Sequence, residues 1–204
     1  MAGRALRLLG VASGMVVVLT ILLGIVYPLA MTGAAQALFP DKADGSLVKL
    51  DGEVVGSELA GQVFTSPAYF HTRPSATTPS DNPSATTFAN LGPNTIALRE
   101  AVDGYISDAL KLERPYTPGL RAKDLPVDMI TTSGSGIDPH ISVANARLQA
   151  ARVAAIRDVP IERVLDLIDG NTEGRSIGFL GEAGVNVLLL NLDLDQLAGP
   201  PPRT

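Results

Sequence analysis

Three side chains with the chemistry of a serine hydrolase stand close together in the sequence, Ser135, Asp138 and His140. The nucleophile-elbow pattern Gly-x-Ser-x-Gly is not met around Ser135. A catalytic triad is also assembled by the fold from distant segments, rather than from neighbours in one loop. The sequence therefore predicts no catalytic residue in this chain.

The sequence also gives little support for a metal site or a phosphate-binding site. His71 and His140 are the only histidines and there is no cysteine, so a zinc site is not expected, and hydrogen-bonded loop residues are the simpler interpretation. The glycine-rich stretch 133–136 could cradle a phosphate with backbone N–H groups. However, the pattern G-x-x-x-x-G-K-[ST] is absent and Asp138 would repel an anion. A tight turn explains these glycines better.

The element that positions everything else is one uninterrupted apolar run, residues 8–29, preceded by Arg4 and Arg7. About 22 residues of helix span roughly 30 Å, the thickness of a bilayer core. We therefore expect a single transmembrane helix over residues 8–29. The positive-inside rule puts residues 1–7 in the cytoplasm and everything after Pro40 outside.

A cleaved signal peptide is the alternative, because Ala35-Gln36-Ala37 resembles a cleavage site. A signal peptide usually has about 7–15 apolar residues, fewer than this run, which favours an uncleaved anchor. Within the run, Gly10, Gly14 and Gly24 stand in small-xxx-small patterns that let a second helix approach closely. Glycine is also ordinary in membrane helices, so a partner helix is one of two interpretations.

Residues 30–198 are enough for one domain with its own core. The net charge of −5 and the lack of a basic run argue against nucleic-acid binding. A β-hairpin is predicted at 47–50 and 53–55 around Asp51-Gly52, and an extended loop, either functional or a plain linker, at 72–93. Helices are predicted at 94–110, 142–158 and 160–170, strands at 127–132 and 185–192, and a disordered tail at 199–204. The fold class is therefore α+β: one N-terminal transmembrane helix followed by one extracytoplasmic α+β domain.

Several strings follow, in order, the pattern of a known family. They include Tyr27-Pro28-Leu29, Gly56-Ser57-Glu58-Leu59, Phe70-His71-Thr72-Arg73-Pro74-Ser75-Ala76, Asn90-Leu91-Gly92-Pro93, Ser133-Gly134-Ser135-Gly136-Ile137-Asp138-Pro139-His140-Ile141-Ser142 and Val185-Asn186-Val187. In this order the chain resembles the C chain of the potassium-transporting P-type ATPase, the KdpC family, over residues 22–197.

The resemblance implies a complex in the bacterial cell inner membrane. Its partners would be a channel-like potassium-translocating chain, a catalytic P-type ATPase chain with the phosphorylated D-K-T-G-T motif, and a small single-span chain. This chain lacks that motif, since Asp41-Lys42-Ala43 is a chance likeness. It would be a non-catalytic accessory subunit, with ATP, Mg and potassium acting in the partner chains.

Two roles are implied by the family. One is a catalytic chaperone that raises the ATP affinity of the ATPase chain, with Gln149 contacting nucleotide. The other is a structural cap beside the extracellular potassium entrance, which the expected outward orientation favours. The chain departs from the family at Ala150 and Ala151, where a proline is usual, and at Asn94-Thr95-Ile96, where Ser-Asn-Pro is usual.

We expect the strings 70–76 and 133–142 to lie together and face the translocating chain. The expected partner-docking residues are Phe70, His71, Arg73, Pro74, Ser135, Asp138 and His140. The rival interpretations are an anchored extracytoplasmic enzyme or ligand-binding module, whose mark would be a concave pocket with convergent polar groups, and a free secreted protein after cleavage.

Overall fold

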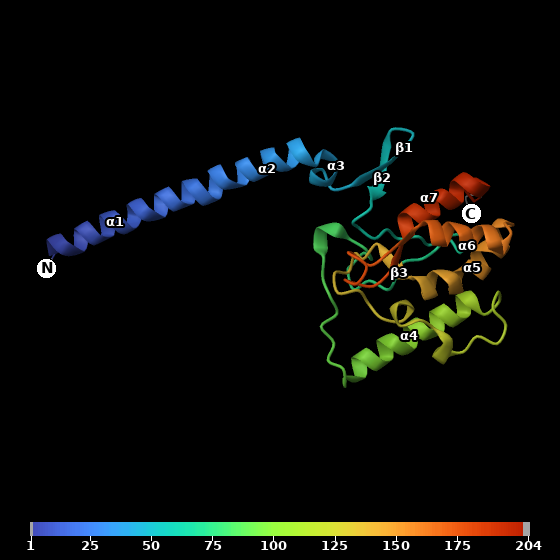
Figure 1. The fold of residues 1–204 in the computed structure, drawn as a ribbon. Coiled ribbons are helices and arrows are strands. Elements are labelled where there is room, and N and C mark those ends of the chain that lie inside the picture. Colours follow the sequence, from blue (N-terminus) through green and yellow to red (C-terminus); the bar gives the residue numbers. More distant parts are fainter. Residues whose placement is uncertain (1, 202–204) are drawn as a thin grey trace. The chain divides into compact units, whose positions relative to one another are not determined.

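The computed structural model describes residues 2–201, and the chain divides between Leu47 and Val48 into two compact units (Figure 1). The first unit is dominated by one helical stretch, Ala2–Leu38, that is long and apolar enough to cross a membrane by length and composition. It comprises α1 (Ala2–Ile21), a π-helical segment η1 (Leu22–Val26) and α2 (Tyr27–Leu38), and a short helix α3 (Pro40–Ala43) follows. The predicted helix over residues 8–29 is therefore present, with longer ends.

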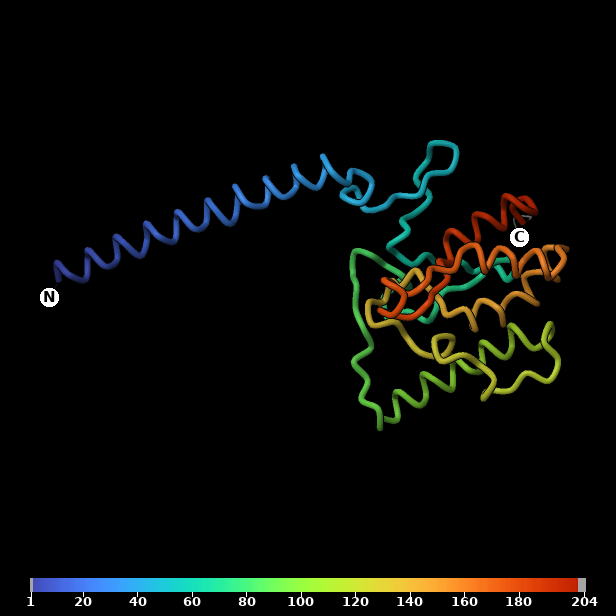
Figure 2. The backbone as a smooth tube through the Cα atoms, viewed as in Figure 1, coloured from blue at the N-terminus to red at the C-terminus, as the bar shows by residue number. Residues whose placement is uncertain are grey.

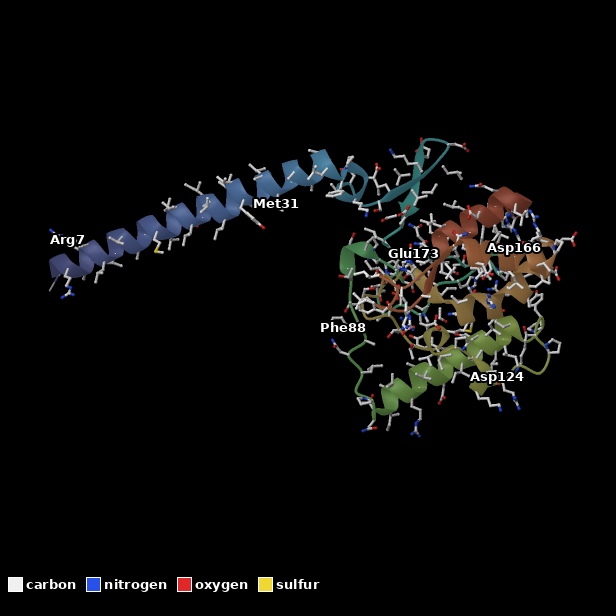
Figure 3. All side chains as sticks on the ribbon, viewed as in Figure 1. Arg7, Met31, Phe88, Asp124, Asp166 and Glu173 are labelled. Carbon is white, nitrogen blue, oxygen red and sulfur yellow. The ribbon has the colours of Figure 1, made fainter. Side chains whose placement is uncertain are left out.

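No residue of α1, η1 or α2 is buried, as expected for a helix whose side chains would contact lipid or another helix. In Figure 3 the side chains along it, Arg7 and Met31 among them, stand away from the backbone. A Cβ atom added at Gly10 or Gly14 would meet nothing within 4 Å, and one at Gly24 would meet only Thr20. The packing of these glycines against a partner helix stays a prediction.

The hairpin predicted around Asp51-Gly52 is confirmed: β1 (Leu47–Leu50) pairs with β2 (Glu53–Ser57). Asp51 and Gly52 have φ values of 51° and 88°. Two successive residues with positive φ are what a type I′ turn requires, and that turn matches the twist of the flanking strands.

The second unit combines a small antiparallel sheet with four helices, which agrees with the predicted α+β mixture. Strand β5 (Gly184–Asn186) lies between β3 (His140–Ser142) and β4 (Thr172–Glu173). The helices are α4 (Ile96–Glu113), α5 (Val143–Arg157), α6 (Ile161–Gly170) and α7 (Val187–Ala198). They lie side by side in the order α7, α6, α5, α4 (Figures 1 and 2).

Three of these helices were predicted, and their caps explain them. The Thr95 side chain accepts a hydrogen bond from the backbone of Leu98, and Ser142 caps α5 by accepting from Asn145 N. Pro160 stands directly before α6 and needs no N–H partner there. Short 3₁₀ turns occur at Pro83–Ala85 (η2), Ala122–Asp124 (η3) and Val127–Met129 (η4).

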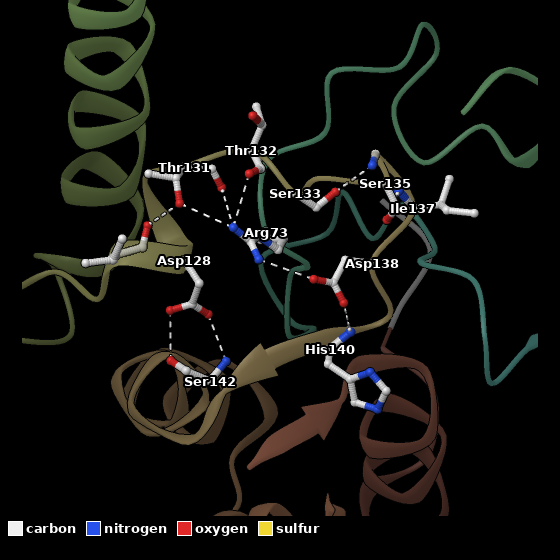
Figure 4. Close-up of polar contacts among 12 residues, drawn as sticks. Arg73, Asp128, Thr131, Thr132, Ser133, Ser135, Ile137, Asp138, His140 and Ser142 are labelled. Carbon is white, nitrogen blue, oxygen red and sulfur yellow. Dashed lines mark hydrogen bonds and ion pairs between the residues drawn. The ribbon is translucent and has the colours of Figure 1, made fainter. Parts of the chain in front are cut away.

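The strand predicted at 127–132 is wrong, because that segment forms the turn η4 followed by irregular chain. The Thr131 hydroxyl donates to the carbonyl of Val127 at 2.7 Å, a local bond that competes with strand pairing. The side chain of Asp128 is turned toward the start of α5 instead of alternating across a sheet (Figure 4).

The strand predicted at 185–192 is also wrong beyond Asn186. The Asn186 side chain accepts from the backbone N–H of Leu189 at 3.2 Å and so starts α7. Val187, Leu190 and Leu194 then recur at helical spacing and are buried. A disordered tail was predicted at 199–204. The Gly199 carbonyl in it accepts a hydrogen bond from Arg157. Residues 202–204 lie outside the described residues.

The core lies where α5, α6 and α7 meet the sheet and the segment that contains Phe70. Its fully buried apolar members share one cluster: Phe70, Ile141, Ala146, Ala150, Val153, Val164, Ile168, Val185, Val187, Leu190 and Leu194. The alanines of α5 let neighbouring backbones approach closely, while Asn145, Gln149 and Arg152 on the same helix are buried as well. A core that contains such polar groups must satisfy them internally.

Candidate functional site

The strings 70–76 and 133–142 lie together, as the sequence predicts. Backbone Ser133 N donates to Pro74 O at 3.1 Å, and the hydroxyl of Ser75 donates to the carbonyl of Gly136 at 2.6 Å. Gly136 has a φ of 77°, and an added Cβ atom would lie 2.5 Å from the carbonyl oxygen of Thr87. Only glycine fits that turn, which supports the structural interpretation of the glycine-rich stretch.

Arg73 joins the two strings electrostatically. Its Nη1 lies 3.3 Å from Asp138 Oδ2, and its Nη2 donates to the carbonyl of Thr132 at 3.1 Å and to the hydroxyl of Thr131 at 3.3 Å (Figure 4). The other oxygen of Asp138 accepts from the backbone N–H of His140 at 3.1 Å. Both charged side chains are about one-quarter exposed, so the ion pair is partly buried.

Ser135, Asp138 and His140, which have the side-chain chemistry of a serine hydrolase, are not arranged as a catalytic triad. Ser135 is exposed and its hydroxyl oxygen accepts from the backbone N–H of Ile137 at 3.2 Å. His140 Nε2 lies 3.6 Å from Glu173 Oε2, and no hydrogen bond joins His140 to Ser135 within residues 2–201. A nucleophile needs its base within hydrogen-bond reach.

Phe70 and His71 belong to an extended segment. Two carboxamide side chains hydrogen-bond to its backbone N–H and C=O groups, as a neighbouring strand would. Asn191 on α7 accepts from Phe70 N and donates to Phe70 O, both at 2.9 Å. Gln149 on α5 accepts from His71 N at 2.8 Å and donates to His71 O at 3.0 Å. We call these two contacts the amide clamps. The Phe70 side chain is fully buried in the core, so it has no surface to offer a partner.

Gln149, the residue that the family resemblance assigns to nucleotide, has no free hydrogen-bonding capacity. Besides its two bonds to His71, its oxygen accepts from Arg152 Nη2 at 2.8 Å and its nitrogen donates to Asn145 Oδ1 at 2.9 Å. A carboxamide offers two donors and two acceptor positions, and all four are used. Only 2% of the surface of Gln149 is exposed, and its contact with nucleotide stays a prediction.

Arg152 is the centre of this buried network. Its side chain is fully buried, its Nε donates to Glu113 Oε1 on α4 at 2.8 Å, and its Nη1 donates to the carbonyls of Pro67 and Tyr69. Burial raises the pKa of Glu113 above its ordinary value, and the charge of Arg152 opposes that shift without overcoming it. One guanidinium therefore ties α4, α5 and the segment before Phe70 together.

Sequence reasoning missed Arg152, Glu113, Asn145 and Asn191. One signal was available for α5, because Asn145, Gln149 and Arg152 are spaced by four and three residues and so share a helix face. These three polar side chains lie on the buried side of α5, together with its buried alanines. Nothing in the sequence identifies Glu113 as the counter-ion of Arg152, since it comes from a separate helix.

The arrangement as a whole is that of a polar core in which buried side chains hold backbone segments together. Among the residues that the structure describes, no group of three or more His, Cys, Asp or Glu side chains could hold a metal ion. Of the predicted docking residues, Ser135 is exposed, while His71, Arg73, Pro74, Asp138 and His140 are half-buried. Their contact with a partner stays a prediction.

Comparison with known proteins gives consistent matches. The family described as "KdpC: K+-transporting ATPase, c chain" matches residues 9–196. A relative from Polaromonas naphthalenivorans is 55% identical over 181 residues, which cover 88% of this chain and 90% of the relative. Relatives from Myxococcus xanthus and Methylorubrum extorquens are 50% and 48% identical over 187 and 196 residues, covering 91% and 90% of this chain and 86% and 94% of their own. All three bear the name "Potassium-transporting ATPase KdpC subunit".

The amide clamp of Gln149 predicts a large loss of stability when its polar head is removed. Gln149→Met keeps the length of the side chain but leaves buried groups on His71, Asn145 and Arg152 without partners. We expect the free energy of unfolding to fall by about 3 kcal/mol, measured by urea denaturation of the full chain in detergent. Gln196→Met, an exposed position on α7, is the control. Equal losses in the two variants would contradict the clamp.

His71 predicts a stability that depends on pH. Burial lowers the pKa of His71 below its ordinary 6.5, although its Nε2 donates to the carbonyl of Ser66. The unfolded chain therefore binds more protons below pH 6.5, and stability present above that pH is lost as the pH falls toward the lowered pKa. We expect His71→Gln to remove this loss in unfolding titrations and His140→Gln to retain it. A slope that follows His140 instead would refute this assignment.

Proposed function

The chain belongs to the KdpC family of K+-transporting ATPase c chains, and from this membership we propose that it is a non-catalytic accessory subunit of an ATP-driven potassium uptake complex. It would stabilise the assembly of a channel-like potassium-translocating chain with a catalytic P-type ATPase chain and a small single-span chain. ATP, Mg and potassium would act in those partners.

The proposed orientation puts the second unit outside the cell membrane, beside the potassium entrance. Arg4 and Arg7 are the charged side chains before the apolar run, and the positive-inside rule assigns that end to the cytoplasm. The helix Ala2–Leu38 supports anchoring in the bacterial inner membrane, because its length and apolar character suit a bilayer. Residues 30–198 would then form the extracytoplasmic domain.

The observation that carries the docking role is an exposed apolar tip on the hairpin between β4 and β5, which we call the 174–183 hairpin. Ile177, Phe179 and Leu180 there are 82%, 69% and 50% exposed. Neighbouring large apolar side chains exposed together mark interaction sites more often than single ones do. None of these three side chains belongs to the core cluster of the domain.

The 174–183 hairpin is also held in shape. Ser176 pairs with Leu180 across it, and Arg175 Nη2 lies 2.8 Å from Glu182 Oε2 at its base. Ile177 adopts a φ of 54°, a left-handed conformation that costs a β-branched residue about 1–2 kcal/mol. Strain retained at an exposed residue is typical of a side chain that must be presented in one orientation.

The catalytic-chaperone role is the second candidate, and the observations oppose it. Gln149 would have to break one of its four hydrogen bonds to contact nucleotide. The exposed carboxylate of Asp108, which lines a cavity next to Gln149, would repel a triphosphate. An extracytoplasmic domain would also be separated from cytoplasmic ATP. An indirect effect on the ATPase chain is the form of this role that the geometry allows.

The docking role predicts that charge on the 174–183 hairpin disrupts the complex. In the double variant Ile177→Asp/Phe179→Asp, we expect the catalytic and translocating chains that co-purify with this chain to fall about tenfold, because the contact loses its apolar centre. Val127→Asp, at a 71% exposed valine on η4, is the matched control. The docking surface is misassigned if both variants retain the partners equally.

The Arg73–Asp138 pair offers a separate test, because charge reversal at Asp138 alone breaks an internal contact as well as a docking one. We expect Asp138→Arg to weaken assembly by the same co-purification. The exchange Arg73→Asp/Asp138→Arg re-forms the ion pair but loses the bonds to Thr131, Thr132 and His140, so it should restore only part of the thermal stability and should not restore assembly. Full recovery of assembly in the exchanged variant would show that the pair serves only the fold.

A further inference from the structure

The helix Ala2–Leu38 changes its hydrogen-bonding pattern within the apolar run, at the π-helical segment η1 (Leu22–Val26). At the end of this segment the backbone N–H of Tyr27 donates to the carbonyl of Leu22, five residues back instead of four. A proline follows at position 28, and proline has no N–H to donate. Single π-helical turns inside α-helices occur frequently at functional sites. This one changes which backbone groups of the helix are paired.

The carbonyl of Leu23 has no donor in the backbone of its own helix. In an α-helix it would accept from the N–H of Tyr27, but that N–H donates to Leu22. In a π-helix it would accept from residue 28, which is the proline. The N–H of Val26 lies inside η1, where donors reach five residues back. The Leu23 carbonyl is therefore open.

Side chains of the same helix do not fill the gap. A serine or threonine within a helix donates to the carbonyl three or four residues before it. For Leu23 those positions are Val26, which has no polar side-chain atom, and Tyr27, whose hydroxyl stands at the far end of a rigid ring. No side chain in the described stretch 2–38 donates to the Leu23 carbonyl.

The open carbonyl lies deep within the apolar run. Leu23 comes six residues before Leu29, the end of the run, which is roughly 9 Å along a helix. An unpaired backbone group is strongly destabilising there, because lipid tails offer no donor and water is scarce. In membrane helices that contain proline, neighbouring helices, hydroxyl side chains or ordered water satisfy the freed groups. Since its own helix offers no hydroxyl, the Leu23 carbonyl calls for a donor from a neighbour.

The helix surface is accessible at this position. Gly24 follows Leu23 directly, and a Cβ atom added to it would meet only the methyl carbon of Thr20, at 4.0 Å. A glycine on a membrane helix lets a neighbouring helix approach closely. Leu23 and Tyr27 are four residues apart and share a helix face. They are 59% and 57% exposed, so that face is open to a partner.

We propose that the segment 22–28 is a docking site for a transmembrane helix of a partner chain, whose hydroxyl or carboxamide side chain donates to the carbonyl of Leu23. Serine, threonine, asparagine and glutamine are the side chains that commonly hydrogen-bond between membrane helices. The proposal rests on the accessory role in a membrane complex. It adds a contact inside the bilayer, separate from the docking surface on the 174–183 hairpin.

A second copy of this chain does not fit as the partner. Two copies would cross the membrane in the same direction, and the hydroxyl nearest in sequence to Leu23 is that of Thr20. Three residues displace it by about 4.5 Å toward the N-terminal end of the helix. Helical side chains also lean toward that end, while the carbonyls point away from it. The donor must therefore come from a different chain.

The test is solid-state NMR of the full chain labelled with carbonyl-¹³C leucine and ¹⁵N-glycine, in lipid bilayers alone and within the purified complex. The labels select leucine carbonyls that precede a glycine, and the chain has four of these, at Leu9, Leu23, Leu91 and Leu180. A carbonyl ¹³C resonance moves downfield when the oxygen accepts a hydrogen bond. We expect the Leu23 resonance to lie upfield of that of Leu9 in the chain alone and to move downfield on assembly. Leu9, in the regular helix α1, is the internal control and should stay in place.

The outcomes separate this contact from the accessory role. Gly24→Ala removes the Leu23 signal from the spectrum and so identifies it. An unchanged Leu23 resonance in an intact complex would overturn the docking site and leave the accessory role standing. A resonance already downfield in the chain alone would also overturn it, because lipid, water or the chain itself would then supply the donor. Failure to assemble with any partner would overturn the accessory role and this proposal with it.

A variant tests the origin of the open carbonyl. Pro28→Ala restores the missing N–H, so the helix can satisfy its carbonyls internally. We expect the Leu23 resonance of the chain alone to move downfield and the retention of partner chains to fall about threefold, the effect of one hydrogen bond between membrane helices. Pro40→Ala, at the start of α3 and outside the apolar run, is the control and should change neither. A Leu23 resonance that stays upfield in Pro28→Ala, or equal retention in the two variants, would refute the proposal.

Discussion

The domain depends on the burial of one cation, the guanidinium of Arg152. A charge out of water is costly unless it is paired and fully hydrogen-bonded, and here the partners come from three separate places in the chain. Glu113 brings α4 to α5, and the carbonyls of Pro67 and Tyr69 bring in the segment before Phe70. The same arrangement aligns Gln149 with the backbone of His71, so the position of the string 70–76 follows from the position of Arg152.

This constraint separates structural polar groups from those that can act on something else. Gln149, Asn191 and Asp128 are polar residues of the kind that suggests a binding site, yet each is used to hold backbone. Large exposed apolar side chains occur on the helix Ala2–Leu38 and on the 174–183 hairpin. These exposed apolar features suit the role proposed for the chain, an accessory subunit of a membrane complex.

The sequence predicted most where the information is local. Ser142 as a cap, Pro160 before a helix and Asp51-Gly52 in a hairpin turn each specify their structure within a few residues. It failed at 185–192, where an apolar run alone does not separate a strand from a buried helix and the cap at Asn186 decided. The Arg152–Glu113 pair joins residues 39 apart in sequence, and long-range pairing of this kind leaves no periodic signal.

The proposed outward orientation of the domain is the claim on which the choice between capping and nucleotide roles depends. The chain contains no cysteine, so one introduced cysteine gives an unambiguous label. Val127→Cys places it at an exposed site far in sequence from the helix Ala2–Leu38. In intact cells that express the complex, a membrane-impermeant maleimide should label Val127→Cys without lysis. Labelling that appears only after the inner membrane is opened would put the domain in the cytoplasm and contradict the account.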